Sequence, residues 1–344
     1  MIKIKDIALE TGLSSATVSR ALNNSGYVSA ANKDKILAAC QKLDYPLPET
    51  MGSKKYDRLN KKLIGIIVPD ITIPYYAVIV NQIERHVLEK GCLLVVACNN
   101  ENSEQELKIL NEFYDQHMAG IIVVPSSGFM KSNYDRLLDL KKNGTSIILF
   151  DRGLYNEEFQ SFDGVFIDDY KSTYIAARHL IEQGHRYISL VIGSSGLTNN
   201  TERYKGYINA LEENNLPFCE DYIVYGGTIG SNYVSTTLTN TKHMLDSHPE
   251  ITAVLSTNNL MTVGVMQAME YPKNPSEIAI VSFDFDYLNQ FYPNQITTIY
   301  RPVENISREL VRILFDRIES SAVIGRKTTP RREIIQPVLK VKQS

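Results

Sequence analysis

Short polar side chains and one arginine recur on one face of a helix predicted from Ser15 to about Asn23. Ser15, Ala16, Ser19 and Arg20 form that face. Small residues allow a close approach to another molecule, and the arginine fork can pair bidentately with a guanine edge. The pattern therefore predicts base recognition in a DNA major groove. The alternative is a small helical hairpin that binds no DNA.

A compact three-helix unit must hold this face in position. A first short helix is expected over residues 6–10, and the glycine after it can adopt the positive φ that ends a helix. A third helix is expected from Ser29 until Pro46 stops it. The glycine that ends the first helix is Gly12, and Ser14 can cap the first turn of the second helix. Val18 and Leu22, four residues apart on the second helix, can pack on Ile7 and Leu13.

Polar side chains also follow most of the short apolar runs in the rest of the chain. Ligands bind at the carboxyl ends of strands in open parallel sheets, so these residues are expected to converge. Amides, carboxylates and guanidiniums in one crevice suit a ligand rich in hydroxyl groups. For each residue alone, a loop cap or a surface charge is an equal alternative. The residues are Asp70, Asn99, Asn100, Ser126, Asp151, Arg152, Gly193, Ser194, Asn258, Asn259 and Asp284.

The elements that carry these residues alternate between apolar strands and amphipathic helices from residue 63 onward. Apolar strands separated by helices predict parallel sheets covered by helices on both faces. Roughly ten strands exceed one comfortable sheet and so predict two lobes. Strands are expected at 63–70, 92–98, 120–125, 146–152, 165–169, 188–193, 222–225, 252–257 and 278–284.

Charge is divided unevenly over the 344 residues. Residues 1–62 hold eleven Lys/Arg and six Asp/Glu, a net +5, and the other residues hold 25 and 33, a net −8. A basic arm on an acidic body is the electrostatic pattern of a DNA-binding unit attached to a sensor. No apolar signal segment or membrane-length run is seen, so a cytoplasmic protein without a membrane partner is expected. The four cysteines are expected to be free thiols.

The stretch KIKDIALETGLSSATVSRALNNSGYVS resembles the N-terminus of the lactose-repressor (LacI/GalR) family of bacterial transcription regulators. Its ATVSR-x-LN segment, the turn and the following VS match the family pattern. The stretches IGIIVPD, IPYY, GIIVVP, IILFDR, VFIDDYKS, ERYKGYINAL, STNNLMTVGVMQAM, VSFDFD and ITTIYRP resemble the sugar-binding core of that family. The resemblance implies an N-terminal all-α helix-turn-helix headpiece and an α/β two-lobed periplasmic-binding-protein-like core with parallel sheets.

The resemblance also implies how the chain is divided. Residues 1–45 would form the headpiece, 46–62 a basic hinge, and 63–344 an effector-binding and dimerisation core. The chain would cross three times between two lobes. Lobe 1 would take about 63–160 and 292–320, and lobe 2 about 161–291 and 321–344.

By the same resemblance we expect a transcriptional repressor that binds a pseudo-palindromic operator as a homodimer, under control of a small effector, predicted to be a sugar. DNA contacts would come from Ser14, Ser15, Ala16, Thr17, Ser19, Arg20, Asn23, Met51, Lys54 and Lys55. Effector contacts would come from Tyr75, Asp151, Arg203, Asn258 and Asp284. The ring of Tyr75 or Phe283 could face the effector, or both rings could belong to the core. The face from Tyr76 to Val87 is a candidate dimer interface, and packing inside its own lobe is the alternative.

Other chemistry has little support in the sequence. The GGTIG stretch at 226–230 lacks the Lys-Ser/Thr of a phosphate loop, and no GxSxG occurs. Asp284 and Asp286 have no evident third metal ligand, and His243 and His248 are spaced wrongly for one helix face. No catalytic residue, cofactor or metal is therefore expected. The remaining alternative is a ligand-binding sensor or enzyme with a vestigial head, which a steep salt dependence of DNA binding would argue against.

Two segments depart from the family pattern. Asn258-Asn259 stands where Asn-Asp is usual, so hydrogen bonding survives there but an ionic role is lost. The segment PLPETMGSKKYDRLNKKL has two residues more than usual between Tyr45 and Ile64. Lys54 takes the position expected for the leucine that pries open the minor groove.

We hypothesise that Met51 replaces that leucine as the apolar wedge, while Lys54, Lys55 and Arg58 contact phosphates. A flexible basic tether without a wedge is the alternative. If Met51 inserts between base pairs, Met51→Ala should lower operator affinity measured at matched salt. An undiminished affinity would exclude the wedge.

Overall fold

The structure, a computed structural model, describes residues 3–23, 28–43, 45, 62–153, 161–227, 232–269, 278–289, 296–321 and 329–342. The chain divides into two compact units, Met1–Lys62 and Leu63–Ser344. The predicted hinge residues Met51, Lys54 and Lys55 lie outside the described residues. Within the described ranges, every helix is too short or too polar to span a bilayer.

The described part of the first unit folds into α1 (Ile4–Thr11), α2 (Ser15–Asn23) and α3 (Ala30–Lys42). The predicted turn is confirmed, because α1 ends at Gly12 with φ 68°, a conformation that glycine adopts without a Cβ clash. α1 begins two residues earlier than expected. The Lys3 amide donates to Asp6 Oδ2 at 2.7 Å and so stabilises an earlier first turn.

An apolar core holds these three helices together. Ile7, Val18 and Leu22 are fully buried in it, and Leu13 packs against them. This is the packing that the spacing of Val18 and Leu22 predicts. Ile36 of α3 completes the core.

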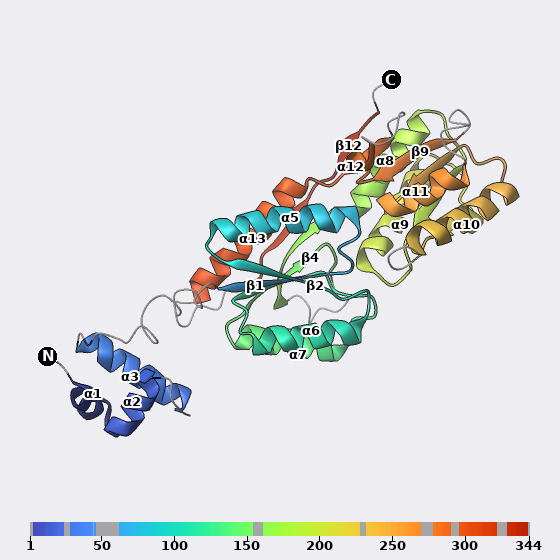
Figure 1. The fold of residues 1–344 in the computed structure, drawn as a ribbon. Helices are drawn as coiled ribbons and strands as arrows, with labels where there is room; N and C mark the ends of the chain where they lie inside the picture. Colours follow the sequence, from blue (N-terminus) through green and yellow to red (C-terminus); the bar gives the residue numbers. More distant parts are fainter. Residues whose placement is uncertain are drawn as a thin grey trace. The chain divides into compact units, whose positions relative to one another are not determined.

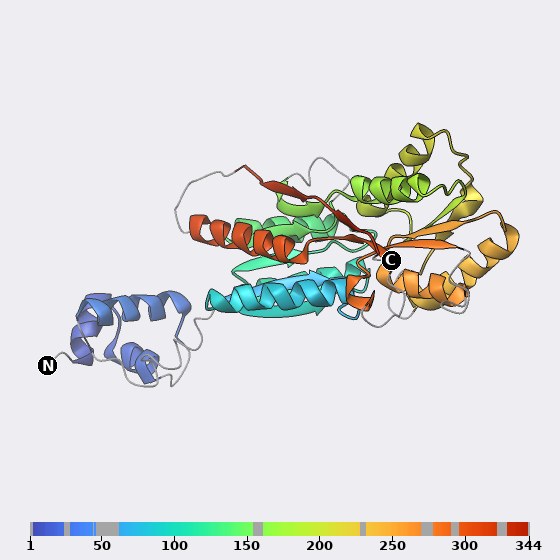
Figure 2. The ribbon, with the colours of Figure 1, turned by 90° about the horizontal axis from the view of Figure 1, so that it is seen from above.

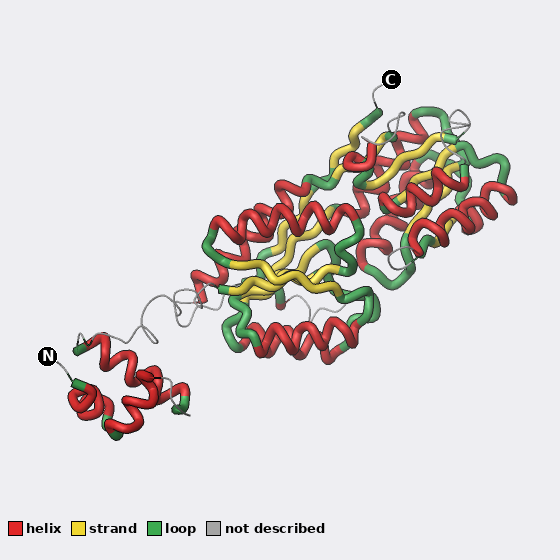
Figure 3. The backbone as a smooth tube through the Cα atoms, viewed as in Figure 1, coloured by secondary structure: helices red, strands yellow, loops and turns green. Residues whose placement is uncertain are grey.

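The second unit contains two sheets, each with helices on both faces (Figures 1 and 3). The first sheet has the order β11-β5-β4-β3-β1-β2 and is parallel throughout. α5 and α13 cover one face, and α6 and α7 cover the other. We call this sheet with its helices lobe 1. Its elements are β1 (Leu63–Val68), α5 (Pro74–Glu89), β2 (Leu93–Cys98), α6 (Ser103–Asp115), β3 (Gly120–Val123), α7 (Lys131–Lys142), β4 (Ser146–Phe150), β5 (Asp163–Ile167), α13 (Val303–Ser321) and β11 (Arg332–Ile335).

The second sheet has the order β12-β10-β9-β8-β6-β7, with β12 antiparallel to β10 and the other pairs parallel. α8 packs on α9 against one face, and α10 packs on α11 against the other. We call this assembly lobe 2. Its elements are α8 (Asp169–Glu182), β6 (Ile188–Ile192), α9 (Thr198–Glu213), η2 (Glu220–Tyr222), β7 (Ile223–Tyr225), α10 (Asn232–Ser247), β8 (Ala253–Ser256), α11 (Asn259–Ala268), β9 (Ala279–Phe283), α12 (Asp286–Asn289), β10 (Thr297–Tyr300) and β12 (Val338–Lys340).

The chain passes three times between the lobes, as predicted, but three strands lie in the other lobe than expected. β5 and β11 were expected in lobe 2 and belong to the first sheet, whereas β10 was expected in lobe 1 and belongs to the second. The reason is backbone pairing: β5 bonds to β4, β11 to β5, and β10 to β9. Figure 2 shows the C-terminal strands running from one lobe to the other.

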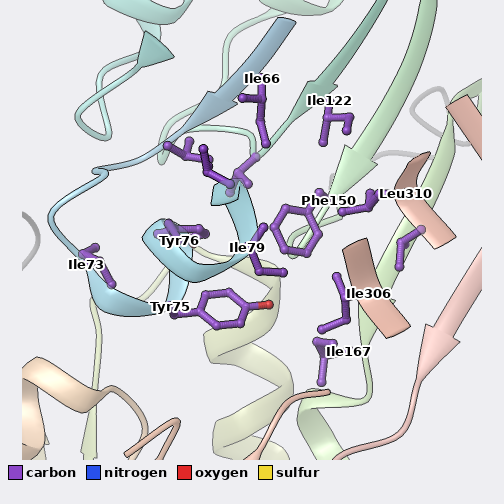
Figure 4. Close-up of a cluster of buried hydrophobic side chains, with 14 of the residues drawn as sticks. Ile66, Ile73, Tyr75, Tyr76, Ile79, Ile122, Phe150, Ile167, Ile306 and Leu310 are labelled. Carbon is purple, nitrogen blue, oxygen red and sulfur yellow. The ribbon is translucent and has the colours of Figure 1, made fainter. Parts of the chain in front are cut away.

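The inner face of α5 is buried inside lobe 1. Tyr76, Ile79, Ile83 and Val87 are at most 5% exposed and belong to the core shared with α13. Figure 4 shows Tyr75, Tyr76 and Ile79 with Phe150 and Ile306 nearby. The prediction of a dimer interface on this face is therefore wrong, and the alternative, packing within its own lobe, is confirmed.

A close approach of α8 and α9 fixes the base of lobe 2. A Cβ on Gly206 would lie 2.1 Å from the carbonyl oxygen of Tyr170, so this crossing admits only glycine. One turn earlier on α9, the Arg203 carbonyl accepts a hydrogen bond from Thr173 Oγ1 at 2.7 Å. The crossing thus sets the position of Arg203.

Candidate functional site

The outer face of α2 carries the predicted base contacts. Ser15, Ala16 and Arg20 are exposed. The predicted cap is confirmed, because the Thr17 amide donates to Ser14 Oγ at 3.1 Å. Arg20 Nε donates to the Ala16 carbonyl at 3.3 Å, which holds the arginine stem along the helix.

Ser19 and Asn23 continue this face one turn further. Asn23 Nδ2 donates to Ser19 Oγ at 3.3 Å. Between Ser15 and Asn23 the sequence has no acidic residue, so the face offers hydroxyls, an amide and a guanidinium without a negative charge. Such a face can approach a phosphate-lined groove.

All five predicted effector contacts line one cavity between the two lobes. Tyr75 and Asp151 come from lobe 1, and Arg203, Asn258 and Asp284 come from lobe 2. The cavity measures about 50 Å³ and lies at the carboxyl ends of strands in both sheets, where ligands of such folds bind. We call it the cleft. Effector binding by these five residues stays a prediction.

Asp151 is the most enclosed carboxylate of the cleft. It follows β4 with a positive φ of 64°, and its side chain is 2% exposed. It accepts hydrogen bonds from the Tyr76 hydroxyl at 3.0 Å and from Arg301 Nη1 at 2.9 Å. A buried carboxylate needs such partners, because an unpaired one would lose its hydration without compensation.

Arg203 is held by neighbours within its own lobe. Its Nε donates to Asp169 Oδ1 at 2.7 Å, and its Nη1 donates to the Thr257 carbonyl at 3.3 Å. The guanidinium carbon lies 5.1 Å from the ring centroid of Phe283. Phe283 itself is fully buried in the core of lobe 2 and does not line the cleft, so the core alternative holds for this ring.

Asn258, which matches the family pattern, and Asn259, which replaces the usual Asp, have different surroundings in this cleft. Asn258 caps α11, because its side-chain oxygen accepts from the amides of Leu260 at 2.8 Å and Met261 at 3.2 Å. Asn259 is the first residue of α11, is 2% exposed and also lines the cleft. A neutral amide thus performs the capping at this helix start.

Two charged residues that line the cleft, Glu101 and Arg301, were not predicted, whereas Arg152 was expected in this crevice. Arg152 donates from Nη1 and Nη2 to the two carboxylate oxygens of Glu101, at 2.8 and 2.6 Å. Arg301 donates to both Asp151 and Asp284. Arg301 follows β10 directly, so the strand-end rule would have found it had 297–300 been predicted as a strand.

The charges of the cleft are balanced. Among its described lining residues, Glu101, Asp151 and Asp284 face three guanidiniums, those of Arg152, Arg203 and Arg301. Balanced, hydrogen-bonding walls suit a neutral polar ligand better than an ion.

Metal binding finds no support in the described part of the chain, where no group of three His, Cys, Asp or Glu could hold an ion. Asp286 pairs instead with Lys340 at 3.0 Å, and His248 lies 3.2 Å from Glu250.

Comparison with known proteins identifies both units. Residues 61–339 match the family described as periplasmic binding proteins and sugar binding domain of the LacI family. Residues 3–46 match the family of bacterial regulatory proteins, lacI family.

Individual relatives match nearly the whole chain. The HTH-type transcriptional repressor PurR of Pasteurella multocida is 29% identical over 330 residues, which are 94% of this chain and 93% of that protein. The solved complex of the transcriptional regulator CelR with cellobiose has a TM-score of 0.70, 23% identity and 99% coverage of both chains. The lac repressor dimer bound to operator and the anti-inducer ONPF has a TM-score of 0.67 and 20% identity, covering 99% of this chain and 98% of that chain. Since the first family match alone spans well over half of the residues, the chain belongs to the LacI family of bacterial regulatory proteins.

Proposed function

We propose that the protein is a cytoplasmic transcriptional repressor whose dimer binds a pseudo-palindromic operator under control of a sugar bound in the cleft. Family membership makes it an effector-controlled, DNA-binding regulator. Members of this family are regulators and not enzymes, which excludes the alternative of an enzyme with a vestigial head.

The exposed face of α2 is the observation that carries the DNA-binding role. Ser14, Thr17 and the residues of that face (Ser15, Ala16, Ser19, Arg20 and Asn23) would contact the major groove. Met51, Lys54 and Lys55 would add contacts from the hinge. The solved lac repressor, which this chain resembles in fold, is bound to operator as a dimer.

The cleft supports a neutral, hydroxyl-rich effector. Asp151 and Asp284 offer acceptors, Arg203 and Asn258 offer donors, and Tyr75 offers an aromatic face. CelR was solved with cellobiose, and a LacI-family regulator from Enterococcus faecium was solved with ribose. Both compounds are sugars, which favours a sugar for this chain.

One edge of the first sheet is suited to dimer formation. β2 is an edge strand, and its residues Leu93 and Val96 are 45% and 42% exposed. Leu88 at the end of the adjacent α5 is 50% exposed. An uncovered strand edge with exposed apolar residues favours association with another chain. We propose that a second copy packs here, and that two heads then read two half-sites.

Capture of fragmented genomic DNA by the full chain should enrich one pseudo-palindrome, and Arg20→Ala should abolish or reduce that enrichment. Loss of one bidentate base contact costs about 1–3 kcal/mol, roughly five- to 150-fold in affinity. Lys42→Ala is the control, because it removes the same charge from a residue paired with Glu10 and should reduce binding only slightly. Repetition with candidate sugars should change the enrichment and identify the effector.

No enrichment by the wild type at low salt, with or without sugars, would contradict the regulator. If Arg20→Ala and Lys42→Ala lowered the enrichment equally, Arg20 would contribute to DNA binding only through its charge and not through a base contact.

Val96→Asp should shift the protein from dimer to monomer, because it places a charge at the proposed interface. Ile334→Asp is the matched control: Ile334 is 61% exposed on β11, the opposite edge of the same sheet. Sedimentation of both variants over a range of concentrations makes the comparison. A dimer that survives Val96→Asp, or one that Ile334→Asp disrupts equally, would exclude β2 as the interface.

The Asp169 carboxylate that orients Arg203 is expected to make stability depend on pH. Burial raises the pKa of Asp169 to about 6 against the opposing effect of Arg203, while Asp151 raises it further and Arg301 lowers it. The folded state therefore binds this proton more tightly than the unfolded state, in which the pKa of the Asp169 carboxyl has its ordinary value of 3.8. The contribution of Asp169 to stability is present below pH 4 and is lost as pH rises through 6, by up to about 3 kcal/mol.

Urea unfolding of the full chain, followed by circular dichroism at pH 4 and pH 7, tests this shift. Relative to Asp169→Asn, the wild type should lose stability between the two pH values. A difference between the two proteins that does not change with pH would contradict the raised pKa.

A further inference from the structure

Arg301 connects the two lobes across the cleft. Its Nη1 donates to Asp151 Oδ1 of lobe 1 at 2.9 Å, and its Nε donates to Asp284 Oδ2 of lobe 2 at 2.8 Å. Its Nη2 also bonds to Asp284. One guanidinium is thus shared by two carboxylates that stand at the ends of β4 and β9.

The surroundings of this guanidinium are those of a bound ligand. Its central carbon lies over the ring of Tyr75, 3.4 Å from the ring centroid. The side chains of Arg301, Asp151 and Asp284 are 8%, 2% and 10% exposed. A planar cation between two carboxylates and above an aromatic face satisfies both its charge and its flat surface.

The other guanidiniums of the cleft do not join the lobes in this way. Arg152 pairs with Glu101 within lobe 1, and Arg203 pairs with Asp169 within lobe 2. Among the described residues that line the cleft, Arg301 is the arginine whose carboxylate partners belong to different lobes.

With Arg301 in place, the cleft leaves little open space beside Asp151 and Asp284. Its volume of about 50 Å³ accommodates a few water molecules. A ligand that reaches Asp151 and Asp284 must therefore displace the guanidinium that already occupies their oxygens.

We propose that Arg301 is an internal ligand of the cleft, which holds the lobes closed without effector and which the effector must replace on Asp151 and Asp284. The proposal rests on the proposed function in placing the effector in the cleft. It also narrows the class of effector. A competitor of a guanidinium must donate hydrogen bonds to two carboxylates, as the hydroxyls of a polyol do and as a phosphate or carboxylate group, which only accepts and is repelled by both, does not.

Arg301→Ala in the full chain tests the proposal without knowledge of the effector. The probe is guanidinium chloride at millimolar concentration, because the variant leaves a site of guanidinium shape between two carboxylates. The readout is hydrogen exchange at the Gly153 amide, which donates to Thr198 Oγ1 across the lobes at 3.1 Å. Without the probe, exchange in the variant should be at least about tenfold faster than in the wild type. Guanidinium should restore slow exchange, and sodium chloride at the same concentration should not.

Arg317→Ala is the matched control. Arg317 also makes a buried bidentate pair, with Asp163 at 2.9 and 2.7 Å, but both residues belong to lobe 1. Its loss should leave Gly153 exchange unchanged while lowering the unfolding midpoint. If Arg301→Ala does not fold, Arg301→Lys replaces it, since one ammonium keeps the charge but cannot reproduce both the fork and the stacking. That variant should show a partial increase in exchange.

Exchange at Gly153 that equals the wild-type rate in the folded Arg301 variants would overturn the proposal, as would rescue by sodium chloride equal to that by guanidinium. A sugar that changes operator binding should bind Arg301→Ala more tightly than the wild type, because no internal competitor remains. If no sugar changes operator binding but guanidinium rescue holds, the sugar effector fails and the internal ligand stands.

Discussion

Neutralisation of buried charge is the constraint on which the cleft depends. Asp151, Asp169, Asp284 and Glu101 all lose water at the junction of the lobes, and each is paired with a guanidinium. Removing one partner of a buried pair costs about 3–5 kcal/mol, since the other charge remains without compensation. The residues of the cleft are therefore interdependent. Contact between the lobes and recognition of a ligand use the same carboxylates, so one process changes the other.

The features that could be predicted from the sequence are those that depend on neighbouring residues along the chain. Gly12 and Ser14 mark the turn and cap of a helix-turn-helix, and each acts within four residues. Most strands were found because apolar runs buried on both faces need no knowledge of their partners. Asp151, Asn258 and Asp284 were expected in one crevice by the rule that ligands bind at the ends of parallel strands, whereas Tyr75 and Arg203 were added by the resemblance to the family.

What could not be predicted depends on contacts between distant parts of the chain. The residues of a strand do not show which sheet it joins, so β5, β10 and β11 were assigned to the wrong lobes. The apolar residues on one face of α5 would look the same in sequence whether they packed on α13 or on a second copy of the chain. Only the tertiary structure shows that they pack on α13. The role of Arg301 needs two carboxylates that precede it by 150 and 17 residues.

The passage between β11 and β12 has a mechanical consequence. Only Gln336 and Pro337 separate a strand of the first sheet from a strand of the second. Gln336 contacts Asp168 at 3.3 Å, and the Asp168 amide donates to the Ile335 carbonyl at 3.1 Å, so two of the three passages are bonded side by side. Two extended residues span about 7 Å at most and cannot stretch. The lobes therefore cannot move straight apart, but they can rotate about these two paired segments. The displacement of an atom then grows with its distance from the rotation axis, so a small rotation at the cleft becomes a large movement at the outer helices.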